Sequence, residues 1–122
     1  MDSISLIKEI CQNIDRFEEE LQLQFHVNIN EAITICLLAT GQYSSGDVSK
    51  LTNMRASHTS KILRSLEEKG FVNRIMGEKD KRLMYFSLTE KGEHAGKVLR
   101  NNDITLPPLI RKLEEVLEKK EK

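Results

Sequence analysis

The strongest constraint on how this chain can fold is a change of hydrophobic period at Gly70. Before that glycine, four residues recur at helical spacing: Thr59, Ile62, Leu63 and Leu66. After it, residues 71–75 and 83–87 are strand-like, and the polar loop of residues 76–82 separates them. The pattern predicts a helix over about residues 55–69 that stops at Gly70, followed by a β-hairpin with a long charged tip.

Helical patterns also precede this segment. Residues 3–23 carry an apolar stripe opposite a polar face: Ile7, Ile10, Ile14, Phe17 and Leu21. A second helix is predicted between an asparagine N-cap, either Asn28 or Asn30, and a stop at Gly41. The N-terminal part of the chain is therefore expected to be helical.

A short third helix is predicted from a serine N-cap, either Ser44 or Ser45, with Val48 and Leu51 facing inward. A short helix, a turn and the helix of residues 55–69 together make a helix-turn-helix. The second helix of such a unit suits the major groove of duplex DNA, which is about 12 Å wide and displays a distinct donor and acceptor pattern for each base pair.

Two more helices are predicted after the hairpin. Thr89 caps the first, with Glu90 in its first turn, and the helix ends near Arg100, where Asn101-Asn102-Asp103 breaks it. Thr105 caps the last helix, whose first turn contains Pro107 and Pro108. Its apolar stripe is Leu106, Leu109, Ile110, Leu113, Val116 and Leu117. The predicted fold is thus mainly α with one small β-hairpin, in the order four helices, hairpin, two helices.

Charge is unevenly distributed although the net charge of the 122 residues is zero. Residues 50–82 hold nine Lys and Arg but four Asp and Glu, and the flanks are acidic overall. This asymmetry is typical of a DNA-facing lobe joined to a region that faces something else. No apolar run is long enough to span a bilayer, and the first residues are charged, so we expect no membrane partner and a cytoplasmic location.

The outward face of the predicted recognition helix carries small hydroxyl groups and cations. These positions are Arg55, Ser57, His58, Ser60, Lys61, Arg64 and Ser65. No Asp or Glu occurs in residues 55–65, whereas a face that is merely solvated usually mixes both signs. We therefore interpret Arg55, Ser57, His58, Ser60, Lys61 and Arg64 as DNA-binding residues.

The hairpin tip supplies a second basic group, made of Lys79, Lys81 and Arg82. It could follow the DNA backbone and place an arginine in a narrow minor groove, where the potential is most negative. Asp80 would be unusual as a direct DNA contact, so we expect it to pair with Arg82 and hold the guanidinium in position. By itself the loop would also fit an ordinary solubilising hairpin.

No pattern indicates catalysis, a metal site or a cofactor. His26, His58 and His94 are isolated, and the sequence has neither a Gly-rich phosphate loop nor an HExxH motif. Cys11 and Cys36 fall on apolar helical stripes and are interpreted as buried thiols. We expect no enzyme activity, no cofactor and no bound metal.

Three motifs in order resemble the MarR family of bacterial regulators. They are Leu66-Glu67-Glu68-Lys69-Gly70-Phe71-Val72-Asn73-Arg74, then Asp80-Lys81-Arg82, then Leu88-Thr89-Glu90-Lys91-Gly92. They match the family's LE-x-KG-hydrophobic-V-x-R segment, its DxR wing and its LTxxG segment. A single such motif is weak, but three in register over about 27 residues are specific.

The resemblance implies a homodimeric winged helix-turn-helix protein. Residues 1–122 would form one MarR-like domain, with a winged core over about residues 30–92 and dimerisation helices over about residues 3–23 and 89–118. Lys61 and its neighbours would read the major groove, and Arg82 would enter the minor groove. The resemblance also implies repression at a palindromic operator, and release of DNA when a small ligand enters the crevice between the two regions or when a cysteine is oxidised.

Two features depart from the family pattern. The segment after Gly92 is shorter than usual, and Asn101-Asn102-Asp103 interrupts what is often one long helix, so the dimer arm is expected to be reduced or rearranged. The surroundings of Cys11 do not resemble the peroxide-sensing branch, which argues against redox control.

The terminal apolar stripes favour a homodimer, because a small winged domain could not cover both of them. The residues predicted to form the interface are Ile7, Ile10, Ile14, Phe17, Leu109, Leu113, Val116 and Leu117. The main alternative is a winged-helix module that binds protein within a larger complex. That alternative predicts no affinity for duplex DNA even at low salt, which the basic middle of the chain argues against.

Overall fold

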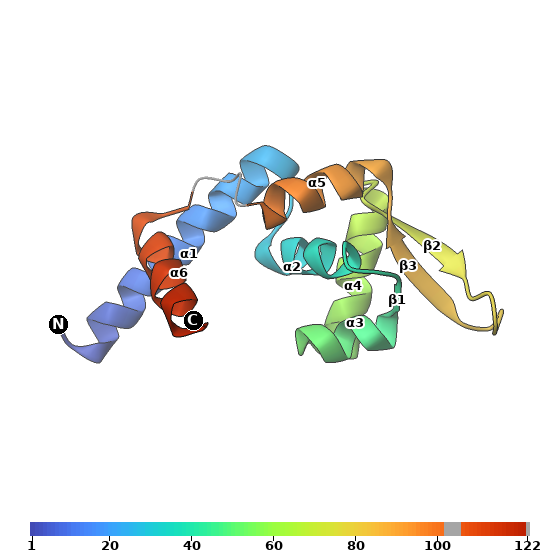
Figure 1. Ribbon diagram of the computed structural model, residues 1–122, viewed down its shortest axis with the longest axis horizontal. Coiled ribbons are helices and arrows are strands. Elements are labelled where there is room, and N and C mark those ends of the chain that lie inside the picture. Colours follow the sequence, from blue (N-terminus) through green and yellow to red (C-terminus); the bar gives the residue numbers. More distant parts are fainter. Residues whose placement is uncertain (102–105, 122) are drawn as a thin grey trace.

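The computed structural model describes residues 1–101 and 106–121 (Figure 1). In these residues the chain forms six helices and one small sheet, in the predicted order. The helices are α1 Ser3–Phe25, α2 Ile29–Leu38, α3 Ser45–Thr52, α4 Ala56–Glu68, α5 Glu90–Arg100 and α6 Pro108–Glu121. The strands are β1 Tyr43–Ser44, β2 Val72–Met76 and β3 Met84–Leu88. The predicted fold class, a winged helix-turn-helix with additional helices, is confirmed.

The sheet is antiparallel with the order β1-β3-β2. In the hairpin, Val72 pairs with Leu88 and Met76 with Met84. The first strand, which lies on the other edge of β3 and pairs Tyr43 with Phe86, was not predicted. Two residues are too few to show an alternating pattern, so this strand is recognisable only from its partner.

The hydrophobic core lies in the winged part of the chain. Its fully buried side chains come from α1, from the α1–α2 connection, from α2, α3 and α4, and from the start of the hairpin: Leu21, Val27, Ile35, Val48, Leu63, Leu66, Phe71 and Val72. The predicted inward face of α4 is confirmed, because Thr59, Ile62, Leu63 and Leu66 are all buried. This packing holds α4 against α2 and α3 and turns its other face outward.

Side-chain caps set the starts of four of the described helices, beginning with Asp2, whose carboxylate accepts from the backbone N–H of Ser5 in α1. Asn28 accepts from the backbone N–H of Glu31, whose side chain accepts in return from the N–H of Asn28, so this residue rather than Asn30 caps α2. Ser44 caps α3 in the same reciprocal way. Thr89 caps α5 as predicted. The predicted Thr105 cap of the last helix, and most of the Asn101-Asn102-Asp103 break, lie outside the described residues.

Helices α1 and α6 form an arm beside the winged core (Figure 1). The two helices contact each other, and α1 also packs against α2 and contributes Leu21 to the core. Both chain ends lie on this arm, while the hairpin projects from the opposite end of the molecule. Within the described residues no helix is both long and apolar enough to cross a membrane.

Three predictions about individual side chains are wrong. Ser65, expected on the outward face of α4, is half-buried, and its hydroxyl donates to the carboxylate of Glu31 on α2. Leu51 is 61% exposed instead of facing inward, because α3 is a two-turn helix that buries only Val48. Cys11 is exposed and Cys36 only half-buried, so the interpretation of both as buried thiols fails for this chain. Burial nevertheless raises the pKa of the Cys36 thiol, although the nearby Arg100 acts in the opposite direction.

Candidate nucleic-acid interface

The outward face of α4 brings the predicted recognition residues together. Ser57, His58, Ser60, Lys61 and Arg64 are all exposed, and Arg55 is exposed at the N-cap position. Lys61 and Arg64 enter no ion pair within the part of the chain that is described, so their charges face solvent. This surface is cationic, and its small neighbours leave room for close approach to a backbone.

Two members of this face already make contacts inside the protein. Nε2 of His58 lies 3.2 Å from Nδ2 of Asn30 at the start of α2. The hydroxyl of Ser60 donates to the backbone carbonyl of Ala56, one turn earlier in α4. His58 therefore lies at the edge of the face towards α2, whereas Ser57, Lys61 and Arg64 are the side chains most available to a ligand.

The turn between α3 and α4 has a fixed geometry. Asn53 caps α3 in the left-handed conformation with a φ of 56°, and its backbone N–H donates to the carbonyl of Lys50. The hydroxyl of Ser49 donates to the carbonyl of Met54 at 2.5 Å. This turn leaves Lys50 and Leu51 exposed beside the start of α4, which adds a cation to the interface that sequence reasoning did not single out.

The wing tip contains the predicted pair of Asp80 and Arg82. Nε of Arg82 donates to Oδ1 of Asp80 and Nη2 donates to Oδ2, both at 3.0 Å, so the contact is bidentate. The side chain of Arg82 is nevertheless 90% exposed. The hydrogen bond from this guanidinium holds the pKa of Asp80 below its ordinary value and raises that of Arg82. Both groups are therefore charged at neutral pH.

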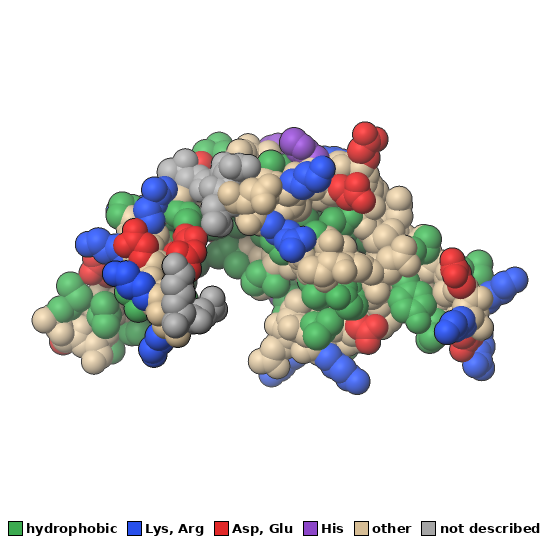
Figure 2. Space-filling view, viewed as in Figure 1, with side chains coloured by type: hydrophobic (Ala, Val, Ile, Leu, Met, Phe, Trp, Pro, Cys, Tyr) green, Lys and Arg blue, Asp and Glu red, His purple; other side chains and the backbone are tan. Residues whose placement is uncertain are grey.

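Lys79 precedes this pair and Lys81 lies between its two members, and both lysines are exposed. Figure 2 shows basic side chains at the wing tip and along the lower surface of the molecule, below α3 and α4 as labelled in Figure 1. The arrangement leaves two separate cationic groups on the winged core, one on the helices and one on the hairpin. Their separation suits a ligand that is long and negatively charged.

Two residues of the basic segment are used inside the fold. Nζ of Lys69 lies 2.9 Å from the carboxylate of Glu31, which is almost completely buried. The guanidinium of Arg74 pairs with Glu67 at 3.1 Å and lies over the ring of Phe86. The excess positive charge of residues 50–82 therefore overstates what an external ligand can reach.

The first and third sequence motifs, residues 66–74 and 88–92, are hydrogen-bonded to each other in the fold. The hydroxyl of Thr89 donates to the carbonyl of Gly70 at 2.6 Å and accepts from the N–H of Gly92. Gly70 has a φ of +84°, which favours glycine. Nζ of Lys91 donates to the carbonyl of Lys69 and lies 4.5 Å from the ring centre of Phe71. These motif residues join α4, the sheet and α5, and they do not face the candidate interface.

The arm exposes the residues predicted to form a dimer interface. Ile7 and Ile14 on α1 and Leu113, Val116 and Leu117 on α6 are exposed. Ile10, Phe17 and Leu109 are half-buried. Ile4 and Leu6, which the prediction omitted, are exposed as well and lengthen the apolar surface of the first turns of α1. Apolar side chains gather on the arm in Figure 2.

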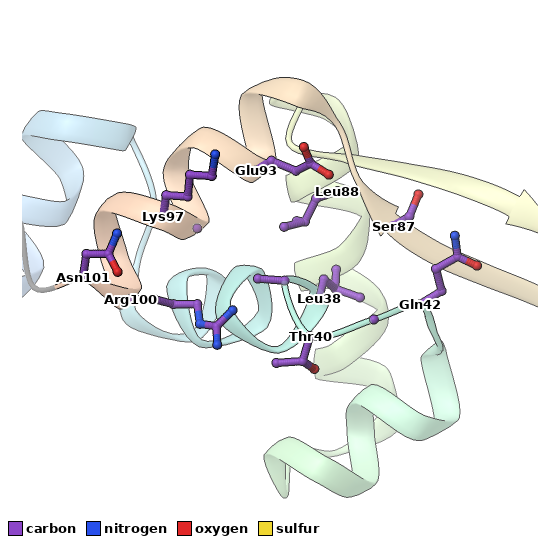
Figure 3. A pocket seen from close by; sticks show the side chains of 12 residues that line it. Leu38, Thr40, Gln42, Ser87, Leu88, Glu93, Lys97, Arg100 and Asn101 are labelled. Atoms are coloured by element: carbon purple, nitrogen blue, oxygen red, sulfur yellow. The ribbon is translucent and has the colours of Figure 1, made fainter.

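A pocket of about 870 Å³ lies between α5, the end of α2 and the base of the wing. Leu38 and Leu88 supply apolar surface, and Glu93, Lys97 and Arg100 supply charge. Figure 3 shows Arg100 extending from α5 towards the end of α2. Among the described residues no cluster of His, Cys, Asp or Glu could hold a metal ion.

Comparison with known proteins agrees with this geometry. Residues 33–92 match the family described as a winged helix DNA-binding domain. No curated protein sequence matches the chain.

Several solved structures share the fold over nearly the whole chain. The MepR–DNA complex of S. aureus is 19% identical with a TM-score of 0.72, over 98% of this chain and 85% of that one. FabT of Streptococcus pneumoniae in complex with DNA is 20% identical with a TM-score of 0.73, over 93% and 78%. The adhesin competence repressor AdcR of Streptococcus pyogenes is 17% identical with a TM-score of 0.70, over 97% and 84%. The chain is therefore a winged-helix protein with the fold of the MarR-type transcription regulators.

Proposed function

We propose that this chain is a sequence-specific regulator of transcription that binds duplex DNA as a homodimer and represses genes from a palindromic operator in the bacterial cytoplasm. The observation that carries the proposal is the outward face of α4. That face presents Lys61 and Arg64 to solvent, with no acidic residue from position 55 to 65. The DNA complexes of MepR and FabT, which share the fold, support the same ligand class.

In this proposal α4 enters the major groove. Lys61 and Arg64 donate to guanine edges or phosphates, and Ser57 lets the helix approach the backbone closely. The wing follows the backbone and Arg82 enters the minor groove, where Asp80 limits the directions its guanidinium can take. The α4 contact carries sequence preference, and the wing adds affinity.

The arm would form the interface with the second copy of the chain. The exposed apolar residues of α1 and α6 would bury one another across a two-fold axis, which places two α4 helices on one face of the duplex. Half-sites about 34 Å apart, one turn of B-DNA, fit such a dimer. The repressor role is proposed by analogy with the adhesin competence repressor AdcR.

A small ligand would control this binding through the pocket between α5 and the base of the wing. Its apolar surface and its two cations, Lys97 and Arg100, suit a small amphipathic organic molecule. Such a ligand changes operator affinity only if it binds the free and DNA-bound arrangements with different affinities.

The direct test is fluorescence anisotropy of labelled duplexes at two salt concentrations. DNA affinity that comes from phosphate neutralisation falls steeply as salt rises. We expect binding at low salt that weakens at higher salt, and weaker binding when Lys61 is replaced by alanine. Absence of binding to duplex DNA at low salt would instead favour the alternative of a winged-helix module that binds protein.

A further inference from the structure

The C-terminal ends of α1 and α4 meet at a single side chain. Lys69 is the C-cap of α4, and its Nζ donates to the backbone carbonyl of His26 at 2.7 Å. His26 is the C-cap of α1 and adopts the left-handed conformation, with φ 58° and ψ 36°. A cation at this position is favoured, because the last carbonyl groups of a helix carry partial negative charge.

The same ammonium group is held by a buried carboxylate. Nζ of Lys69 lies 2.9 Å from both carboxylate oxygens of Glu31, whose side chain is 3% exposed. Glu31 also accepts from the hydroxyl of Ser65 on α4 at 2.8 Å and from the backbone N–H of Asn28 at 3.0 Å. One carboxylate therefore joins the start of α2 to the last turns of α4.

This polar cluster lies where the arm joins the winged core. Leu21 and Val27 bury apolar surface at the same junction, but apolar packing alone tolerates small rotations. A charge-assisted hydrogen bond is directional, and a buried carboxylate without its partner is costly. A second polar contact, from the N–H of Ile29 to Glu18 of α1 at 3.2 Å, lies next to the cluster.

We propose that Lys69 and Glu31 are positioning residues that fix the angle between the arm and the recognition helix, and thereby the separation of the two recognition helices in the dimer. The inference rests on the proposed homodimer. The arm is the part that pairs with the second copy, so a rotation at this junction moves α4 of each protomer relative to the other. Lys69 and Glu31 do not contact DNA in the proposed complex.

The test measures the separation of the two α4 helices without DNA. A spin label is placed at Ser60→Cys in residues 1–122 that also carry Cys11→Ser and Cys36→Ala. The distance between the two labels of the dimer is measured by pulsed electron paramagnetic resonance. We expect a narrow distribution in the parent and a broader or displaced one in Lys69→Met. Lys69→Arg, which can still donate to both His26 and Glu31, should restore the narrow distribution.

Two further variants make the measurement decisive. Arg74→Met is the matched control, because it breaks a different ion pair of the winged core, with Glu67, and should leave the distribution unchanged. Glu31→Gln keeps the size of the side chain and removes its charge, so it decides the question if Lys69→Met does not fold. Unchanged distributions in both Lys69→Met and Glu31→Gln would overturn the inference, as would a parent without any inter-protomer distance.

Binding to DNA gives the second readout. Palindromes with the same half-sites and spacers of different lengths are compared, and the preference of the parent for its best spacer should fall by about tenfold in Lys69→Met, the amount expected from the loss of one charge-assisted hydrogen bond. A parent that dimerises with a narrow distribution but binds no duplex would refute the proposed function and leave the positioning role standing. Equal spacer preferences in parent and variant would refute the positioning role alone.

Discussion

A Cβ atom on Gly92 would lie 2.1 Å from the carbonyl oxygen of Phe71. The same carbonyl accepts from the backbone N–H of Thr89, the N-cap of α5, so it cannot move away without loss of that hydrogen bond. The first turn of α5 thus lies directly against the chain that leaves α4. The position requires glycine because of close approach and not because of an unusual φ.

We expect Gly92→Ala to lower the free energy of unfolding by about 1–3 kcal/mol, the usual cost of forcing an extra methyl group into a packed site. Chemical denaturation followed by circular dichroism measures the change. Gly46→Ala is the matched control, because Gly46 is also helical and its Cβ would meet only the Ser44 hydroxyl at 3.8 Å. That control should be neutral or stabilising by up to about 1 kcal/mol. Equal effects at the two glycines would refute the close-approach argument.

Lys61→Ala should weaken operator binding by about 1–3 kcal/mol if the ammonium contacts a base edge. The loss should depend on operator sequence, whereas a phosphate contact would weaken binding to all duplexes alike and reduce the salt dependence. Titration of labelled duplexes by anisotropy distinguishes the two outcomes. Lys112→Ala, an exposed cation on α6, is the control and should bind DNA like the parent. If Lys61→Ala bound DNA with the affinity of the parent, Lys61 would not be part of the interface.

Arg82→Ala should also weaken DNA binding, and Asp80→Ala should weaken it through the loss of a fixed guanidinium direction. If Asp80 acts only through Arg82, the double variant should bind no worse than Arg82→Ala. Anisotropy titrations of the four proteins complete the cycle. Additive losses would show instead that Asp80 acts independently of the arginine.

The ion pair of Asp80 and Arg82 should also depend on pH. The guanidinium holds the pKa of Asp80 below its ordinary value of 3.8. The stabilisation that the ion pair gives to the folded wing is therefore present above pH 3.8 and is lost as the pH falls through the lower pKa of the folded state. An NMR titration of the side-chain carboxyl should give a pKa below 3.8, and Arg82→Ala should return it towards 3.8. An unchanged pKa in Arg82→Ala would contradict the assigned cause.

Leu113→Asp should weaken the dimer by about thirtyfold or more, because a buried interface side chain is typically worth at least about 2 kcal/mol. Light scattering over a concentration series measures the change. Leu51→Asp is the control, since Leu51 is exposed on α3, away from the arm. A Leu113→Asp protein that stayed dimeric would exclude α6 from the interface.

The elements that sequence could predict are those with local signals. The buried stripe of α4, the Thr89 cap and the hairpin each follow from residues a few positions apart. The pairing of Asp80 with Arg82 was predictable for the same reason, because its partners are two positions apart.

The features that were missed depend on distant partners. Lys69 is one of the nine cations of residues 50–82, yet its partner Glu31 is 38 positions away and becomes adjacent only when α2 packs on α4. The short strand β1 likewise depends on β3. The side of Leu51 was mispredicted because two helical turns hold too few apolar residues to fix which face is buried.

Selection of bound duplexes from a random library by the protein of residues 1–122 tests whether a homodimer of this chain recognises DNA. We expect enrichment of one palindrome whose half-sites lie about 10 base pairs apart, centre to centre, because two copies of α4 would read the same sequence on one face of the DNA. A library no different from the input would contradict DNA recognition, and enrichment of a single unrepeated site would contradict the homodimer.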